Sequence, residues 1–382
     1  LTVKPSNGIL PPSGITLEIT ADPSTLPNGT FTSSIILTLS ETSGAARRSA
    51  NANTKLTLPI SINLVTPISP VPVKEATSPH ALVIPTVGHL DGINSHWQSD
   101  VRVTNAGFAS TRYRLTFTPA AGIGENVQQT TITVDAGATT ALDDILESWY
   151  GVGVLGETAS GMLEILPLDD PAVTTLTTVA SSRTYNVTAD GTLGQFIPAI
   201  RYGGFIGKAL NGALPQLLSL QQIAQTGAYR TNVGVADGSG AGASVLMKFF
   251  NSAGLKLLEL PVQLAPGEQR QLNAVLATHG IELADGRIEV QVLDGPGKVT
   301  AYASVVDNLT NDPLLVSGPL LEPTGATRWV LPGAANLDNP VAHWRTDMRI
   351  FNYGAVPQPA TLTFFPSNGG APTNAQVQLH DG

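Results

Sequence analysis

The fold of this chain is decided by the segment His96-Trp97-Gln98-Ser99-Asp100-Val101-Arg102-Val103-Thr104-Asn105. It returns near the end of the sequence as His343-Trp344-Arg345-Thr346-Asp347-Met348-Arg349-Ile350-Phe351-Asn352, and a fainter copy lies between them at 229–237. In each copy an aromatic residue precedes a polar pair, an Asp or Asn, and an alternating run that ends in Asn or Asp. Such alternation predicts a half-buried β-strand, and the closing residue predicts a turn after it. The sequence is therefore a tandem repeat of β modules.

Further segments of the first two copies correspond in the same order. The matching pairs are 133–137 with 263–267, 142–146 with 272–276, 161–165 with 286–290, and 173–179 with 299–305. The pair at 142–146 and 272–276 predicts a short helical turn, and the others predict strands with their turns. Each unit is long enough for a β-sandwich of seven or eight strands.

Composition supports an all-β protein and excludes several functional classes. Charged residues make up 13% of the 382 residues, about half of the usual share of roughly 25%, and there are 38 glycines and 28 prolines. The net charge of −9 argues against nucleic acid as a partner, and no apolar run reaches the length of a membrane span. The absence of cysteine excludes disulfides and thiolate metal sites.

The repeats predict the domain boundaries. We expect a partial module at 1–66, a proline-rich linker at 67–79, a first sandwich at 80–195, a second at 196–328, and a partial third at 329–382. Between the starting motif Phe196-Ile197-Pro198 and its aromatic strand, the second unit carries extra residues, which we interpret as an insertion at 201–227. Helical spacing of apolar residues after Pro215 predicts a helix there.

The N-terminal segment resembles a known module. The motifs Pro5-Ser6-Asn7-Gly8, Asp22-Pro23-Ser24 and Leu26-Pro27-Asn28-Gly29-Thr30-Phe31 resemble the second half of a BACON-type or related bacterial immunoglobulin-like module. The resemblance covers about residues 1–66 and implies export, with carbohydrate or surface binding proposed for some members.

The later repeats resemble immunoglobulin-like repeats of secreted bacterial surface proteins. The most specific segment is Ser182-Arg183-Thr184-Tyr185-Asn186 followed by Gly191-Thr192-Leu193-Gly194-Gln195-Phe196-Ile197-Pro198. The second unit departs from it, with Asp307-Asn308-Leu309-Thr310-Asn311 at the same place. The expected fold is therefore tandem immunoglobulin-like β-sandwiches in an elongated array, joined end to end, in an extracellular or cell-surface bacterial protein.

Two sets of residues are candidates for a role in binding or packing. The insertion predicts an interaction surface formed by Leu217, Leu220, Gln221 and Ile223. The alternative is that the insertion forms a helix that caps the sandwich. The recurring aromatics Trp97, Tyr229 and Trp344 predict a packing role in the core of each repeat, and the alternative is a platform for stacking carbohydrate.

The remaining polar clusters do not predict a cofactor, a metal or a reaction. His89, Asp91, His96 and Asp100 lie close together, and the third unit repeats the last three as Asp338, His343 and Asp347. Because the second unit offers Ala228 and Asn232 instead of His96 and Asp100, we expect solvated loop residues and a turn-capping Asp. The acidic cluster Asp143, Asp144 and Glu147 is expected to favour a helix N-terminus. No catalytic motif is present, so an enzyme is not expected.

The two ends of the sequence predict partners. The sequence begins at Leu1 inside a strand pattern, and the third repeat stops soon after the strand at 376–379. We expect both partial modules to be completed by the rest of a longer chain or by a neighbouring copy in a filament. The function predicted is a non-catalytic extracellular structural or adhesive protein. The alternative is a carbohydrate-binding accessory region of a larger secreted enzyme.

Overall fold

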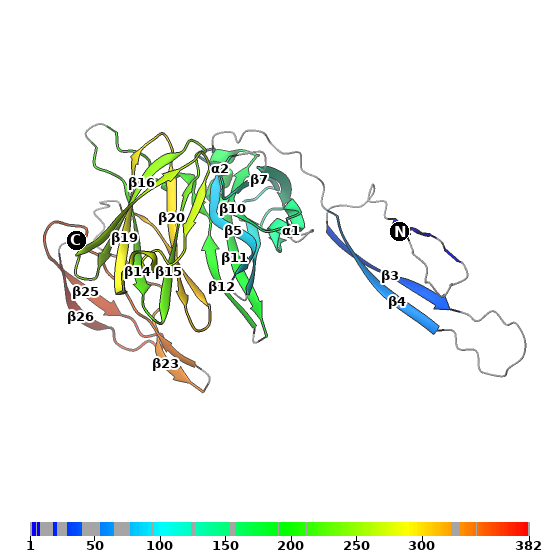
Figure 1. Ribbon diagram of the computed structural model, residues 1–382. Coiled ribbons are helices and arrows are strands. Elements are labelled where there is room, and N and C mark those ends of the chain that lie inside the picture. The colour runs from blue at the N-terminus through cyan, green and yellow to red at the C-terminus, as the bar shows by residue number, and fades with distance from the viewer. Residues whose placement is uncertain are drawn as a thin grey trace, which may run out of the picture.

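The computed structural model describes residues 2–4, 6–7, 18–20, 29–39, 54–64, 77–92, 95–123, 127–152, 157–189, 191–210, 213–321, 328–340 and 342–380. The described residues are mostly β, with 58% in strands and 6% in helices, and the sheets are antiparallel (Figure 1). The all-β prediction is confirmed. None of the helices within these ranges is both long and apolar enough to cross a membrane.

The first sandwich has two layers that share one long strand. Its helices are α1 (Ile145–Tyr150) and α2 (Pro171–Thr177). Its strands are β5 (Leu82–Gly92), β6 (Ser95–Asn105), β7 (Thr111–Pro119), β8 (Gln128–Val134), β9 (Thr139–Leu142), β10 (Ala159–Pro167), β11 (Thr178–Thr188), β12 (Gly191–Pro198) and β13 (Ile200–Arg201). One layer runs β8-β7-β10-β5 and the other runs β9-β6-β11-β12. β5 pairs with β10 over most of its length and with β6 at its end, and the apolar core lies between the layers.

The second sandwich repeats this strand order. Its elements are η1 (Tyr202–Gly204), β14 (Leu217–Gln225), β15 (Tyr229–Asp237), β16 (Ala243–Asn251), β17 (Lys256–Leu264), β18 (Gln269–Leu272), η2 (Ala277–His279), β19 (Leu283–Asp294), β20 (Val299–Asp307), β21 (Pro313–Ser317) and β22 (Leu320–Leu321). Its layers run β17-β16-β19-β14 and β18-β15-β20-β21. Three of the four matched segment pairs lie in equivalent elements. The fourth does not, because α2 occupies 171–177 and the strand equivalent to β20 begins at Thr178.

The polar residues of the repeated segment hold two kinds of turn: a distant one before the short helix, and the predicted one that follows the segment. The carboxylate of Asp100 accepts the N–H of Asp144 at 2.9 Å, and the amide of Asn232 accepts the N–H of Ala274 at 2.9 Å. The closing residue Asn105 is fully buried and donates to the carbonyls of residues 109 and 134 at 2.8 and 3.0 Å. These bonds explain why the sequence preserves an Asp or Asn at both places.

The predicted start of the second sandwich is wrong. The boundary between Gln195 and Phe196 falls inside β12, which pairs with β11 along its whole length and closes the first sandwich. The predicted insertion at 201–227 contains β14, the first strand of the second sandwich, and the predicted helix is therefore absent from 213–227. A bulge explains the misleading pattern, because Gln222 has φ +58° and the register with β19 shifts between Leu220 and Ile223.

The two sandwiches are stacked sheet against sheet rather than end to end. β10 and β20 are buried almost throughout, so both faces of each strand are covered. An apolar cluster between the sandwiches contains Val83, Met162, Tyr202, Phe205 and Ala236. Backbone bonds join the loops beside it, with the Ile123 N–H donating to Pro266 and the Gln269 N–H to Ala120. We call this contact the sandwich interface; it is visible in Figure 1 where β5 and β10 lie beside β15 and β20.

The other described strands form hairpins. They are β1 (Thr2–Lys4) with β2 (Glu18–Thr20), β3 (Gly29–Leu39) with β4 (Thr54–Leu64), β23 (Asn336–Asn339) with β24 (Ala342–Arg345), and β25 (Gln358–Phe364) with β26 (Thr373–Leu379). The proline-rich linker lies outside the described residues except for 77–79.

Candidate functional site

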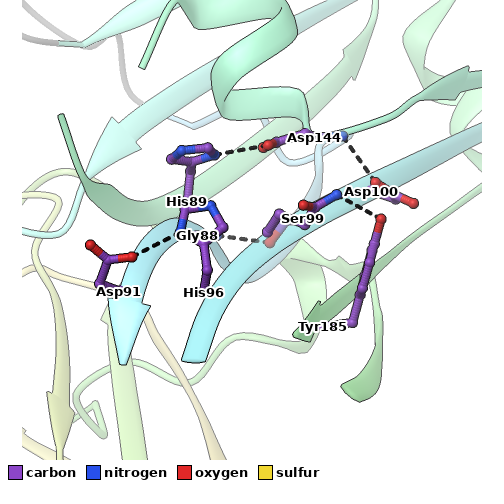
Figure 2. A network of polar contacts seen from close by, with 9 residues as sticks. Gly88, His89, Asp91, His96, Ser99, Asp100, Asp144 and Tyr185 are labelled. Atoms are coloured by element: carbon purple, nitrogen blue, oxygen red, sulfur yellow. Dashed lines mark hydrogen bonds and ion pairs between the residues drawn. The ribbon is translucent and has the colours of Figure 1, made fainter. Parts of the chain in front are cut away.

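A polar corner of the first sandwich brings together residues from β5, β6 and the start of α1. His89 Nδ1 lies 2.8 Å from Asp144 Oδ2, and the backbone N–H of Asp144 donates to Asp100 (Figure 2). Beneath them, Ser99 Oγ accepts the N–H of Gly88 at 2.8 Å and shares a hydrogen bond with Thr184. The corner is therefore anchored to both layers of the sandwich.

A second histidine–aspartate pair lies on the hairpin that follows. His96 Nδ1 is 2.9 Å from Asp91 Oδ1, and the His96 ring meets the His89 ring edge to face, with centroids 4.7 Å apart. The hairpin of β23 and β24 repeats this pair, with His343 Nδ1 2.8 Å from Asp338 Oδ1. Both pairs are largely exposed, but their residues lie in strands and not in loops as predicted, and His89 is a buried residue of β5.

The buried members of the corner have an unusual electrostatic environment. Desolvation raises the pKa of Asp144 above its ordinary value, although the neighbouring His89 opposes the shift. Asp144 precedes α1 with φ +38°, but its side chain makes no capping bond to the helix and turns to His89 instead. Asp144 thus lies at the N-terminus of α1, where the sequence places the acidic cluster, but it does not cap the helix with a hydrogen bond. Asp143 points elsewhere and pairs with Arg102 at 2.7 Å.

Glu147 completes a set of metal-binding atom types. One donor atom each from His89, Asp144 and Glu147 lies within 4.8 Å of the others. His89 and Asp144 are buried, and Glu147 is half-buried. An imidazole nitrogen with two carboxylate oxygens is a donor set that suits zinc and related cations.

The recurring aromatics do not lie in the sandwich cores, contrary to the prediction. Trp344 is 57% exposed and Tyr229 is 44% exposed. Trp97 is half-buried, and it lies over Gly92 of its own hairpin, where a Cβ would come 2.8 Å from its indole nitrogen. Each of them lies within the first three residues of its strand, beside a hairpin turn and away from the middle of the sheet.

The predicted interaction surface is also mostly wrong. Leu217, Leu220 and Ile223 belong to β14 and are buried, the last two completely, because Leu220 and Ile223 pack into the core of the second sandwich. Gln221 alone of the four lines a groove, of about 450 Å³, between the second sandwich and residues 349–352 and 378–380. On its wall Arg287 lies between the rings of Phe250 and Phe351, 4.0 and 4.1 Å from their centroids.

Comparison with known proteins adds no relative. A scan against protein-family models finds no match, and a search of curated protein sequences finds none either. The sequence indicated His89 and its neighbours as one cluster and Asp144 and Glu147 as another. It did not indicate that they meet. One sequence signal could have linked the two clusters, because the second unit lacks members of the first cluster and members of the second cluster at the same time.

Proposed function

We propose that this chain is a non-catalytic extracellular structural or adhesive protein built from tandem immunoglobulin-like β-sandwich modules. The observation that supports this role is the sandwich interface, which joins two copies of one module into a single unit. Modules connected by a bare linker reorient freely, whereas a buried interface transmits load between them. A structural or adhesive protein requires such stiffness, and the resemblance of the repeats to bacterial surface proteins agrees with it.

The interface has the character of a protein interior at its centre. Phe205 is 2% exposed, and its ring lies 5.3 Å from that of Tyr202. It rests directly on Gly238, where a Cβ would come 2.4 Å from the ring. Truncating a buried phenylalanine costs about 3–5 kcal/mol, so Phe205 is the side chain on which the joint depends most.

The experiment compares the intact chain with Phe205→Ala and with the matched control Leu210→Ala. Leu210 lies in the same connecting segment and is 82% exposed. Each form is displayed on bacterial cells, and the cells retained on a surface are counted as flow increases. We expect the chain to increase retention and Phe205→Ala alone to lose it at high flow. Retention that is no better than that of undecorated cells, on abiotic and polysaccharide surfaces alike, argues against the proposal.

A second candidate function, a carbohydrate-binding accessory region, is favoured by the exposed aromatics. Trp329 is 79% exposed and Trp344 is 57% exposed, as expected for side chains that stack on sugars. Affinity electrophoresis in gels containing soluble polysaccharides tests this candidate. Trp344→Ala should abolish any retardation, whereas Leu309→Ala, at a 91% exposed site, should not. Unretarded migration in every polysaccharide removes the second candidate.

A further inference from the structure

The buried corner contains a carboxylate oxygen that lacks a partner. Asp144 is 8% exposed, and its Oδ2 is satisfied by His89. Its Oδ1 is buried and has no hydrogen-bond partner among the residues that the structure describes. A buried acceptor left unsatisfied is destabilising, and for a carboxylate the natural partner is a cation. Among the described residues, Asp144 forms its ion pair with His89, and the carboxylate of Glu147 is the other potential metal ligand nearby.

The second sandwich shows that the fold does not need these side chains. Val87 on β5 pairs with Gly161, and Ile223 on β14 pairs with the equivalent glycine, Gly286. Two residues further along these strands, Gln225 takes the place of His89. Gln225 is also buried, at 9% exposed, and its side chain accepts a backbone N–H instead.

The turn before α1 also keeps its shape in the second sandwich without the metal-binding side chains. Ala274 takes the place of Asp144 and keeps the positive φ, +44° against +38°. Ala277 takes the place of Glu147. All three donor residues of the first sandwich are thus replaced together in the second, while the turn and its bond to Asn232 persist. The set His89, Asp144 and Glu147 therefore serves something other than the shape of the module.

We propose that His89, Asp144 and Glu147 form a zinc-binding site that joins the end of β5 to the start of α1. Zinc accepts nitrogen and oxygen ligands in a tetrahedron, in which neighbouring ligand atoms lie about 3.4 Å apart. The three donor atoms lie within 4.8 Å of one another, close enough to share one ion. Calcium does not fit, because it takes six to eight oxygen ligands. The proposed site is independent of the structural or adhesive function.

The test measures zinc bound by the tag-free chain after removal of metal with a chelator. Equilibrium dialysis at low-micromolar free zinc, with metal quantified by mass spectrometry, should give one zinc per chain. The triple variant His89→Gln, Asp144→Ala, Glu147→Ala reproduces the residues of the second sandwich, so it should keep its circular dichroism spectrum. We expect it to bind zinc at least about tenfold more weakly and to lose the rise in melting temperature that zinc produces.

Two further forms keep the result interpretable. His343→Ala removes the exposed pair of the third unit and should still bind one zinc. Glu147→Ala alone supplies the same test as the triple variant should that variant fail to fold. The proposal is overturned by an intact chain that binds no zinc, by stoichiometric zinc in the Glu147→Ala or triple variant, or by displacement of the zinc with equimolar calcium.

Discussion

Replacing Tyr302 with phenylalanine removes one hydroxyl from the sandwich interface and leaves the ring in place. Tyr302 is 1% exposed on β20, and its Oη lies 2.8 Å from Gln269 Nε2 and 3.1 Å from Gln271 Oε1. It also bonds to Thr86 of the first sandwich. The variant leaves the buried side-chain amide of Gln269 without this partner, so we expect the free energy of unfolding to fall by about 1–3 kcal/mol at pH 7.

The same hydroxyl also makes the free energy of unfolding depend on pH. Burial raises the pKa of Tyr302 from 10.0 to about 12. The folded chain therefore holds this proton more tightly than the unfolded chain. The stability that comes from this raised pKa is complete below about pH 10 and is lost as the pH rises toward 12. The loss amounts to about 2 kcal/mol by pH 12. Because phenylalanine does not titrate, the advantage of the intact chain over Tyr302→Phe should shrink to nearly zero over that range.

Urea denaturation followed by circular dichroism, from pH 7 to pH 12, measures both effects. Tyr353→Phe is the control, because Tyr353 is 53% exposed and should change the unfolding free energy by less than about 0.5 kcal/mol at either pH. A loss below about 0.5 kcal/mol for Tyr302→Phe at pH 7 would refute the proposed hydrogen-bond network. A stability difference that stays constant up to pH 12 would refute the burial of the hydroxyl.

Three other substitutions test the fold by the same denaturation assay at pH 7. Gly234→Ala should cost about 3 kcal/mol or prevent folding, because the new Cβ would lie 2.1 Å from the Tyr302 ring; a well-folded variant would show that the ring is elsewhere. Asn105→Ala should cost about 2–3 kcal/mol, since it removes a buried amide and leaves the buried carbonyl of Val134 without this donor. Leu220→Ala should cost about 2–5 kcal/mol and Leu214→Ala, at an 87% exposed site, under about 0.5; equal losses would contradict the strand assignment of β14.

Local patterns in the sequence predicted more of the fold than of the candidate site. Asn105 marks the turn after its strand because its short polar side chain bonds to backbone groups at residues 107 and 109, close by in the sequence. Bonds of this local kind can be predicted without the tertiary structure. The contact of His89 with Asp144 cannot, because it depends on where β5 ends relative to α1.

The sequence by itself determined the class of the strands, their repetition and the residues that end them, since alternation and turn chemistry act over a few residues. Tertiary structure decided the rest. At β14 a bulge at Gln222 placed apolar residues three apart and imitated a helix, and only pairing with β19 distinguishes the two. The side-by-side stacking of the sandwiches was likewise undetermined, because burial of a second sheet face depends on a surface contributed by another module. For Met162 and Ala236 that surface is the sandwich interface, which no local pattern encodes.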